Sequence, residues 1–178
     1  LGKILLVFPT HSFEDCDDLY DFNQFSQCID EMAKDYDTVL ISMIGYDIQQ
    51  GFDKKYRNKG YRIVSSGTRN DPYFLNRQRD LMELADMTIS NNIGTHIGYS
   101  ICLGTPHYIF NQDITSIKKA ASAQASDHLQ AIRDREYAEI KAVFNSREPI
   151  ITPEQIAVVK KYWGPFEIKP KFYANTQE

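Results

Sequence analysis

The sequence predicts an α/β fold built on a mostly parallel sheet of about five or six strands, with a C-terminal helical extension. Two observations carry this prediction. Short apolar runs alternate with stretches of helical spacing over about the first 110 residues, and the run at residues 3–8 is apolar enough for a strand covered on both faces. Repeated β–α units join parallel strands through right-handed crossovers and place helices on both sides of the sheet. The expected architecture is therefore a Rossmann-like three-layer sandwich.

Five strands are expected in this part of the chain, each a short run rich in apolar or β-branched residues. They cover residues 3–8, 38–44, 61–65, 87–90 and 107–110. Helices are expected between them, over residues 18–34, about 52–59, 72–84 and 95–103. Gly60 suits the C-terminus of the second helix, while Asp71 as N-cap and Pro72 at the first position suit the start of the third.

Residue composition changes after residue 113. Residues 114–144 contain Ala, Lys and Glu in a pattern that favours a long helical stretch. Thr152, Pro153 and Glu154 mark the start of a last helix that ends near Gly164. We expect residues 1–164 to form one domain and residues 165–178 to form an irregular tail.

Composition excludes several classes of function. The net charge of −4 argues against binding to nucleic acid or to anionic membranes, and no apolar run reaches the 18 residues that a membrane span needs. Three widely spaced cysteines do not resemble a disulfide or zinc framework, so we expect a reducing, cytoplasmic setting. The chain begins with Leu rather than Met, which leaves open that it is a piece of a longer protein.

The polar, glycine-containing loops follow the predicted strands, where ligands of such sheets bind. One of these turns contains Ser90, Asn91, Asn92, Gly94 and Thr95, and a short helix begins there. Because a helix N-terminus presents unpaired N–H groups and about half a positive charge, it is suited to a phosphate group. Small residues let a ligand approach the backbone. The turn therefore predicts a nucleotide-binding domain.

Residues 85–106 resemble the nucleotide-sugar-binding signature of the C-terminal domain of GT-B glycosyltransferases and of the related UDP-sugar 2-epimerases. The resemblance rests on Ser90, on the pair Gly94 and Thr95, and on Gly104-Thr105-Pro106, which stand at matching spacing. It implies that residues 1–164 are a Rossmann-like nucleotide-sugar-binding domain. The implied enzyme transfers a sugar to a polysaccharide or glycolipid acceptor, as in bacterial surface-polysaccharide biosynthesis.

The resemblance also implies the partners. A nucleotide-sugar is the donor substrate, and no metal or other cofactor is needed. An N-terminal acceptor-binding domain, in the same or another chain, supplies the catalytic base, so this chain is expected to be incomplete for catalysis. The expected location is the cytoplasm. Peripheral contact with the inner membrane and the formation of a homodimer are both left open.

One departure from the signature concerns the ribose. Many of these enzymes carry glutamates four or five residues after the turn glycine, where this chain has Gly98 and Tyr99. Either Tyr99 or a main-chain amide binds the ribose, or the site is altered. The alternative function is therefore a non-catalytic nucleotide- or partner-binding Rossmann-like module. A small hydrolase or phosphotransferase ranks last, because its usual glycine and serine motifs are missing.

Candidate site residues come from two loops near the expected donor phosphates. His11 is the candidate catalytic residue, because a histidine at a strand end can donate to a phosphate, and Ser12 is a candidate phosphate ligand. The competing explanation is that Ser12 or Asp15 only caps the next helix. Thr95 and His96 begin the short helix and are candidate phosphate contacts. The competing explanation is a plain helix cap made by Asn91, Asn92 or Thr95.

The loop after the third strand supplies Ser66, Gly67 and Arg69 as candidate nucleotide-binding residues. Arg69 could bind a diphosphate through two nitrogens, or pair with Asp71 on the surface.

The remaining polar residues have structural explanations. These are a turn at residues 45–47, a hydrogen-bonded core histidine at His107, a core Cys102, a surface His128, a solvated helix face at Arg77 and Arg79, and a solvated helix start, rather than a metal site, at the acidic residues 14–18.

Overall fold

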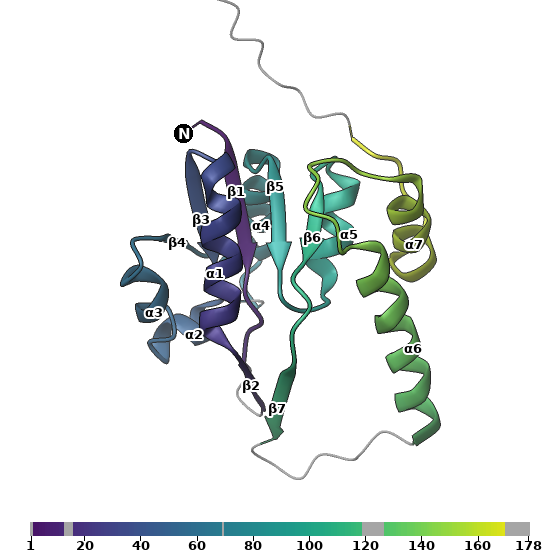
Figure 1. The fold of residues 1–178 in the computed structure, drawn as a ribbon, viewed down its shortest axis with the longest axis horizontal. Helices are drawn as coiled ribbons and strands as arrows, with labels where there is room; N and C mark the ends of the chain where they lie inside the picture. Colours follow the sequence, from purple (N-terminus) through teal and green to yellow (C-terminus); the bar gives the residue numbers. More distant parts are fainter. Residues whose placement is uncertain (1, 13–15, 69, 119–126, 170–178) are drawn as a thin grey trace, which may run out of the picture.

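A computed structural model describes residues 2–12, 16–68, 70–118 and 127–169, and the α/β prediction is confirmed. Five strands form one parallel sheet in the order β4-β3-β1-β5-β6 (Figure 1). The strands are β1 (Ile4–Phe8), β3 (Thr38–Ser42), β4 (Arg62–Val64), β5 (Met87–Ser90) and β6 (His107–Ile109). Each lies within a predicted strand, so the apolar runs located all five.

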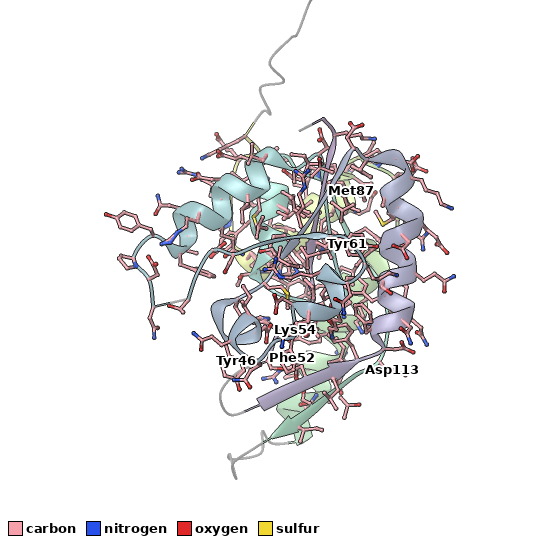
Figure 2. The ribbon with its side chains drawn as sticks, turned by 90° about the vertical axis from the view of Figure 1, so that its left-hand side faces the viewer. Tyr46, Phe52, Lys54, Tyr61, Met87 and Asp113 are labelled. Carbon is pink, nitrogen blue, oxygen red and sulfur yellow. The ribbon has the colours of Figure 1, made fainter. Side chains whose placement is uncertain are left out.

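The centre of the sheet is buried on both faces, since every side chain of β1 is apolar and buried. Leu5 and Val7 pack on one face with α1 (Phe22–Met32), while Leu6 and Phe8 pack on the other with the end of α4 (Phe74–Leu84). Figure 2 shows α1 and α4 on opposite sides of the sheet, with Met87 between them. This is the three-layer sandwich.

The region 45–57 contains two short helices, α2 (Gly45–Gln49) and α3 (Lys54–Arg57). Figure 2 shows Tyr46, Phe52 and Lys54 together on this side of the molecule. The turn expected at residues 45–47 is therefore wrong. Asp47 is buried there, and its Oδ1 accepts a hydrogen bond from the backbone N–H of Ser12 at 3.3 Å, which holds α2 against the loop after β1.

A two-stranded antiparallel ribbon replaces parts of two predicted helices. It consists of β2 (Cys16–Tyr20) and β7 (Ile114–Lys118), and Figure 1 shows it extending beyond the end at which the parallel strands finish. The helix expected over residues 18–34 therefore begins only at Phe22, with Asp21 as its N-cap. Cys16–Asp18 are strand rather than a helix start. The other acidic residues of that run, Glu14 and Asp15, lie outside the described residues.

The helical stretch expected over residues 114–144 is correct only in its second half, where α6 (Asp127–Val143) forms. Ala120, Ala121, Ala123 and Ala125, on which that expectation rested, lie outside the described residues. The last helix, α7 (Pro153–Trp163), is confirmed, with Thr152 as N-cap. The Thr152 side chain and Gln155 exchange hydrogen bonds with each other's backbone, which satisfies two N–H groups of the first turn.

Helix α7 packs against α5 (Thr95–Cys102) through a separate apolar cluster. The cluster joins α5, β6, α6 and α7, and its buried members are Ile97, Ile101, Ile109, Ile140, Phe144, Val158 and Val159. Gly98 permits this contact, because a Cβ there would lie 2.8 Å from Cγ of Trp163. The C-terminal helices are therefore bound to the sheet through α5 and directly through β6, where the N–H of Ile109 donates to the carbonyl of Phe144 at 2.8 Å.

Gly98→Ala is expected to destabilise the protein by about 1–2 kcal/mol, although alanine normally favours a helix over glycine by about 1 kcal/mol. The added methyl group would overlap the Trp163 ring. Urea denaturation measures the difference. The cost should shrink in a Trp163→Leu background, and a more stable Gly98→Ala protein would contradict the close packing.

The start of α4 differs from the prediction in the role of Asp71. Asp71 does not cap α4, whose N-cap is Tyr73, but accepts from the Tyr73 backbone and pairs with Arg77. Arg77 therefore makes an ion pair where a solvated helix face was expected. Among the described residues, no helix is both long and apolar enough to cross a membrane.

Candidate functional site

The strand order places a crevice at the carboxyl end of the sheet, between β1 and β5. The chain adds β3 and β4 on one side of β1 and then β5 and β6 on the other, so the connections diverge there. Open parallel sheets bind ligands at this switch point. Because Phe8 of β1 is in register with Ser90 of β5, the loops that follow the two strands leave the sheet side by side.

Hydrogen bonds join these two loops across the switch point. The backbone N–H of Thr10 donates to Oδ1 of the buried Asn91 at 2.6 Å. In the other direction, Nδ2 of Asn92 donates to Oγ1 of Thr10 at 3.0 Å. The two asparagines therefore hold the loops after β1 and β5 together. Asn91 does not line the cavity described next.

A cavity of about 410 Å³ opens at this crevice. Its wall comes from the ends of β1 and β3, the loops after β4 and β5, and the first turns of α4 and α5. The lining residues are Phe8, Pro9, Thr10, His11, Ser42, Met43, Ile44, Ser66, Phe74, Gln78, Asn92, Ile93, Gly94, Thr95 and His96. His11, Ser66, Asn92, Gly94, Thr95 and His96 were all candidates on sequence grounds, and the fold brings them together.

The N-terminus of α5 forms one end of this wall. Gly94 is the N-cap and has an extended backbone, and no described side chain caps the helix. The competing explanation, a plain cap made by Asn91, Asn92 or Thr95, is therefore wrong: Oδ1 of Asn92 accepts from the adjacent N–H of Ile93 instead. The first amides of α5, together with the hydroxyl of Thr95, can bind an anionic oxygen.

A buried hydrogen-bond network supports this turn from beneath. His107, confirmed as a core histidine, contacts Oγ1 of Thr88 through Nδ1 at 2.8 Å and Oγ of Ser90 through Nε2 at 3.1 Å. Ser90 donates its own proton to the backbone carbonyl of Asn92 at 2.7 Å, so Nε2 of His107 is the donor to Ser90. Ser90 thus shapes the turn and does not line the cavity.

His96 lies in the cavity wall as part of a row of aromatic rings. Its ring stacks on Phe8, with centroids 5.0 Å apart and planes at 17°, and lies 5.4 Å from the ring of His107. Burial and, to a smaller extent, charge repulsion from His11 lower the pKa of His96 to about 3, against the opposing effect of a hydrogen bond with the Asn92 backbone. His96 is therefore neutral at physiological pH.

The loop after β1 contributes His11 but not Ser12. His11 lines the cavity together with His96. Ser12 is buried outside the lining, where its Oγ accepts from the backbone N–H of Asp18 at 3.2 Å. Ser12 therefore anchors the β2 strand. Asp21, rather than Ser12 or Asp15, caps the following helix.

The loop after β4 contributes Ser66. Its Oγ is buried and has no hydrogen-bond partner among the described residues. Gly67 lies behind the lining, with φ of +89°, and its carbonyl accepts from the N–H of Gly45 at 3.3 Å. Arg69 lies outside the described residues. The acid expected to pair with it, Asp71, forms its described ion pair with Arg77 at 2.5 Å.

Tyr99 lies outside this cavity, in a neighbouring hollow that shares Gln78 with it. It is 40 % exposed and lines a second, largely apolar hollow of about 370 Å³ between α4, α5 and residues 166–169. Cys102, expected in the core, is half-buried in the same hollow. Gly98 packs on Trp163 instead. Neither Gly98 nor Tyr99, the two residues at the position of the expected glutamates, therefore lines the switch-point cavity.

Sequence reasoning missed the side of the cavity formed by β3 and α4. Ser42, Met43 and Ile44 are the last three residues of the strand predicted over residues 38–44, and the rule on strand ends could have found them. Phe74 and Gln78 are four residues apart on α4 and therefore share a helix face, but no motif distinguishes them.

Within the described residues, no group of three or more His, Cys, Asp and Glu side chains is placed to hold a metal ion. No family model, curated protein or solved structure matches the chain.

Proposed function

We propose that the chain is the nucleotide-sugar-binding domain of a glycosyltransferase of the GT-B kind, which transfers a sugar to a polysaccharide or glycolipid acceptor. The observation that carries this proposal is the cavity at the switch point between β1 and β5, with the uncapped N-terminus of α5 in its wall. A dinucleotide or nucleotide-sugar combines a flat base with a diphosphate, and this cavity offers a surface for each.

The diphosphate would lie against the first turn of α5. The amides of that turn and the Thr95 hydroxyl are suited to the two negative charges. In sugar transfer the nucleoside diphosphate leaves as the bond to the sugar breaks, so donors fixed at this point stabilise the charge that develops. His11, in the same wall, is our candidate for a side chain that assists the departing phosphate.

The base would lie toward β3, β4 and α4. Met43, Ile44 and Phe74 make that part of the wall apolar, while Ser66 and Gln78 provide hydrogen-bonding groups. The hydroxyl of Ser66 is buried without a described partner, and a base edge would satisfy it. The acceptor and the catalytic base would come from a second domain in the same or another chain.

A binding module without catalysis is the second candidate. The packing of Gly98 on Trp163 favours it, because this contact leaves no room for a ribose-binding carboxylate at position 98. Nucleotide binding alone is consistent with both candidates. They differ in whether a partner domain restores sugar transfer.

Thermal unfolding with UDP, GDP, ADP, TDP, CMP and their sugar conjugates tests the proposal. A ligand at 100 times its Kd stabilises the folded state by about 2.7 kcal/mol, which raises Tm by several degrees for a domain of this size. We expect one nucleotide class to raise Tm and Thr95→Val, which removes one hydroxyl contact, to weaken its binding by about threefold to tenfold.

Ser116→Ala is the matched control, since Ser116 is on β7 and bonds to Asp18 rather than to the cavity. It should leave affinity unchanged. If no nucleotide or nucleotide-sugar shifts Tm at millimolar concentration, the donor site is refuted. A shift that survives equally in Thr95→Val and Ser116→Ala would place binding away from α5.

A further inference from the structure

The feature that carries a further inference is a ring nitrogen of His96, a residue that lines the cavity. Nε2 of His96 is buried and has no hydrogen-bond partner among the described residues. A buried polar atom without a partner destabilises the site, so a ligand that supplies the partner gains affinity there. His107 behind it has both ring nitrogens paired.

The surroundings of His96 decide which ligand group suits it. The ring stacks on Phe8 and lies beside His107, which in turn contacts Phe144 edge-on at 6.0 Å. This row of rings disfavours a phosphate charge, because burial of an ion among apolar groups is costly. The backbone amides of α5 are the better place for the anion.

An uncharged hydroxyl fits Nε2 whichever ring nitrogen carries the proton, because a hydroxyl both donates and accepts. We propose that His96 is a specificity-determining residue whose Nε2 hydrogen-bonds a hydroxyl of the bound nucleotide or of its sugar. This inference rests on the proposed function and assigns to His96 a role other than contact with a phosphate. The low pKa of His96 agrees with a neutral binding group and not with a general base.

Two substitutions isolate the nitrogen. His96→Phe keeps a ring to stack on Phe8 but removes Nε2, whereas His96→Gln keeps a hydrogen-bonding amide near the Nε2 position. Calorimetric Kd values are measured for UDP, GDP and ADP, for their 2′- and 3′-deoxy counterparts, and for the matching nucleotide-sugars. Urea denaturation of both variants establishes that they are folded.

We expect the wild-type protein to prefer a ribonucleotide over one deoxy counterpart by about threefold to tenfold, which is the value of one hydrogen bond. His96→Phe should abolish that preference and His96→Gln should retain part of it. If the preference concerns the sugar instead, the same pattern appears between nucleotide-sugar and nucleotide, and the hydroxyl belongs to the sugar.

Equal weakening of every ligand by His96→Phe would overturn the inference, since it would show a structural role. A hydroxyl preference that persists undiminished in His96→Phe would also overturn it. Both outcomes leave the proposed function intact. The absence of any nucleotide binding by the wild-type protein would instead refute the proposed function, and this inference with it.

Discussion

Lowering the pH from 7.5 to 5.0 is expected to destabilise the protein by at least about 2 kcal/mol, because His96 stays neutral in the folded state. An unfolded histidine has a pKa of about 6.5, whereas burial lowers that of folded His96 to about 3. Between these values the unfolded chain binds a proton that the folded chain does not. The stability contribution is therefore complete above about pH 7 and falls as the pH drops toward 3.

His107 acts in the same direction. Burial lowers its pKa well below the ordinary value, and repulsion from His96 adds to the effect. Carboxylates with lowered pKa values, such as Asp30 and Glu139, lose their contribution only near and below their ordinary range. The interval from pH 7.5 to 5.0 thus isolates the histidines.

Urea denaturation at the two pH values measures the loss. In His96→Gln, which cannot titrate, the difference in unfolding free energy between the two pH values should shrink by about 2 kcal/mol. A wild-type protein equally stable at both pH values would contradict the burial of neutral histidines. So would a loss that is unchanged in His96→Gln.

The parallel sheet was predictable because its strands have apolar residues on both faces, a local property of the sequence. The β2–β7 ribbon was not predictable in this way. Asp18 of β2 pairs with Ser116 of β7, almost a hundred residues away, and Leu19 and Phe22 have a spacing that also suits a helix. Only the distant partner decides that residues 16–20 are extended.

The same contrast between local sequence rules and distant contacts applies to the candidate site. The rule that ligands lie at strand ends located the loops of His11, Ser66 and Thr95, and the fold places all three in one cavity wall. The rule gives no side-chain directions. Tyr99 lies outside this cavity, in the wall of the second hollow. Trp163, which takes the space beside Gly98, belongs to a helix about sixty residues further along the chain.

Gly94→Ala is expected to weaken nucleotide binding by at least about tenfold while the protein stays folded. A Cβ at Gly94 would lie 2.8 Å from both Cε1 and Nδ1 of His96. The His96 ring already stacks on Phe8. The added methyl group must therefore push this ring to a new position within the cavity wall. The methyl group would also stand at the N-cap of α5, where the proposed ligand would approach the backbone.

The backbone of Gly94 is extended, a conformation that alanine also adopts, so the expected loss comes from space rather than from strain. The matched control is Gly45→Ala, at the first turn of α2 beside the cavity residue Ile44. A Cβ there meets its nearest atom, Cγ2 of Thr68, at 3.4 Å, which is ordinary contact. Calorimetry should find the control close to wild type. Equal Kd values for Gly94→Ala and wild type would show that the ligand does not lie against the β5–α5 turn, because a methyl group at this position cannot avoid both the His96 ring and a bound phosphate.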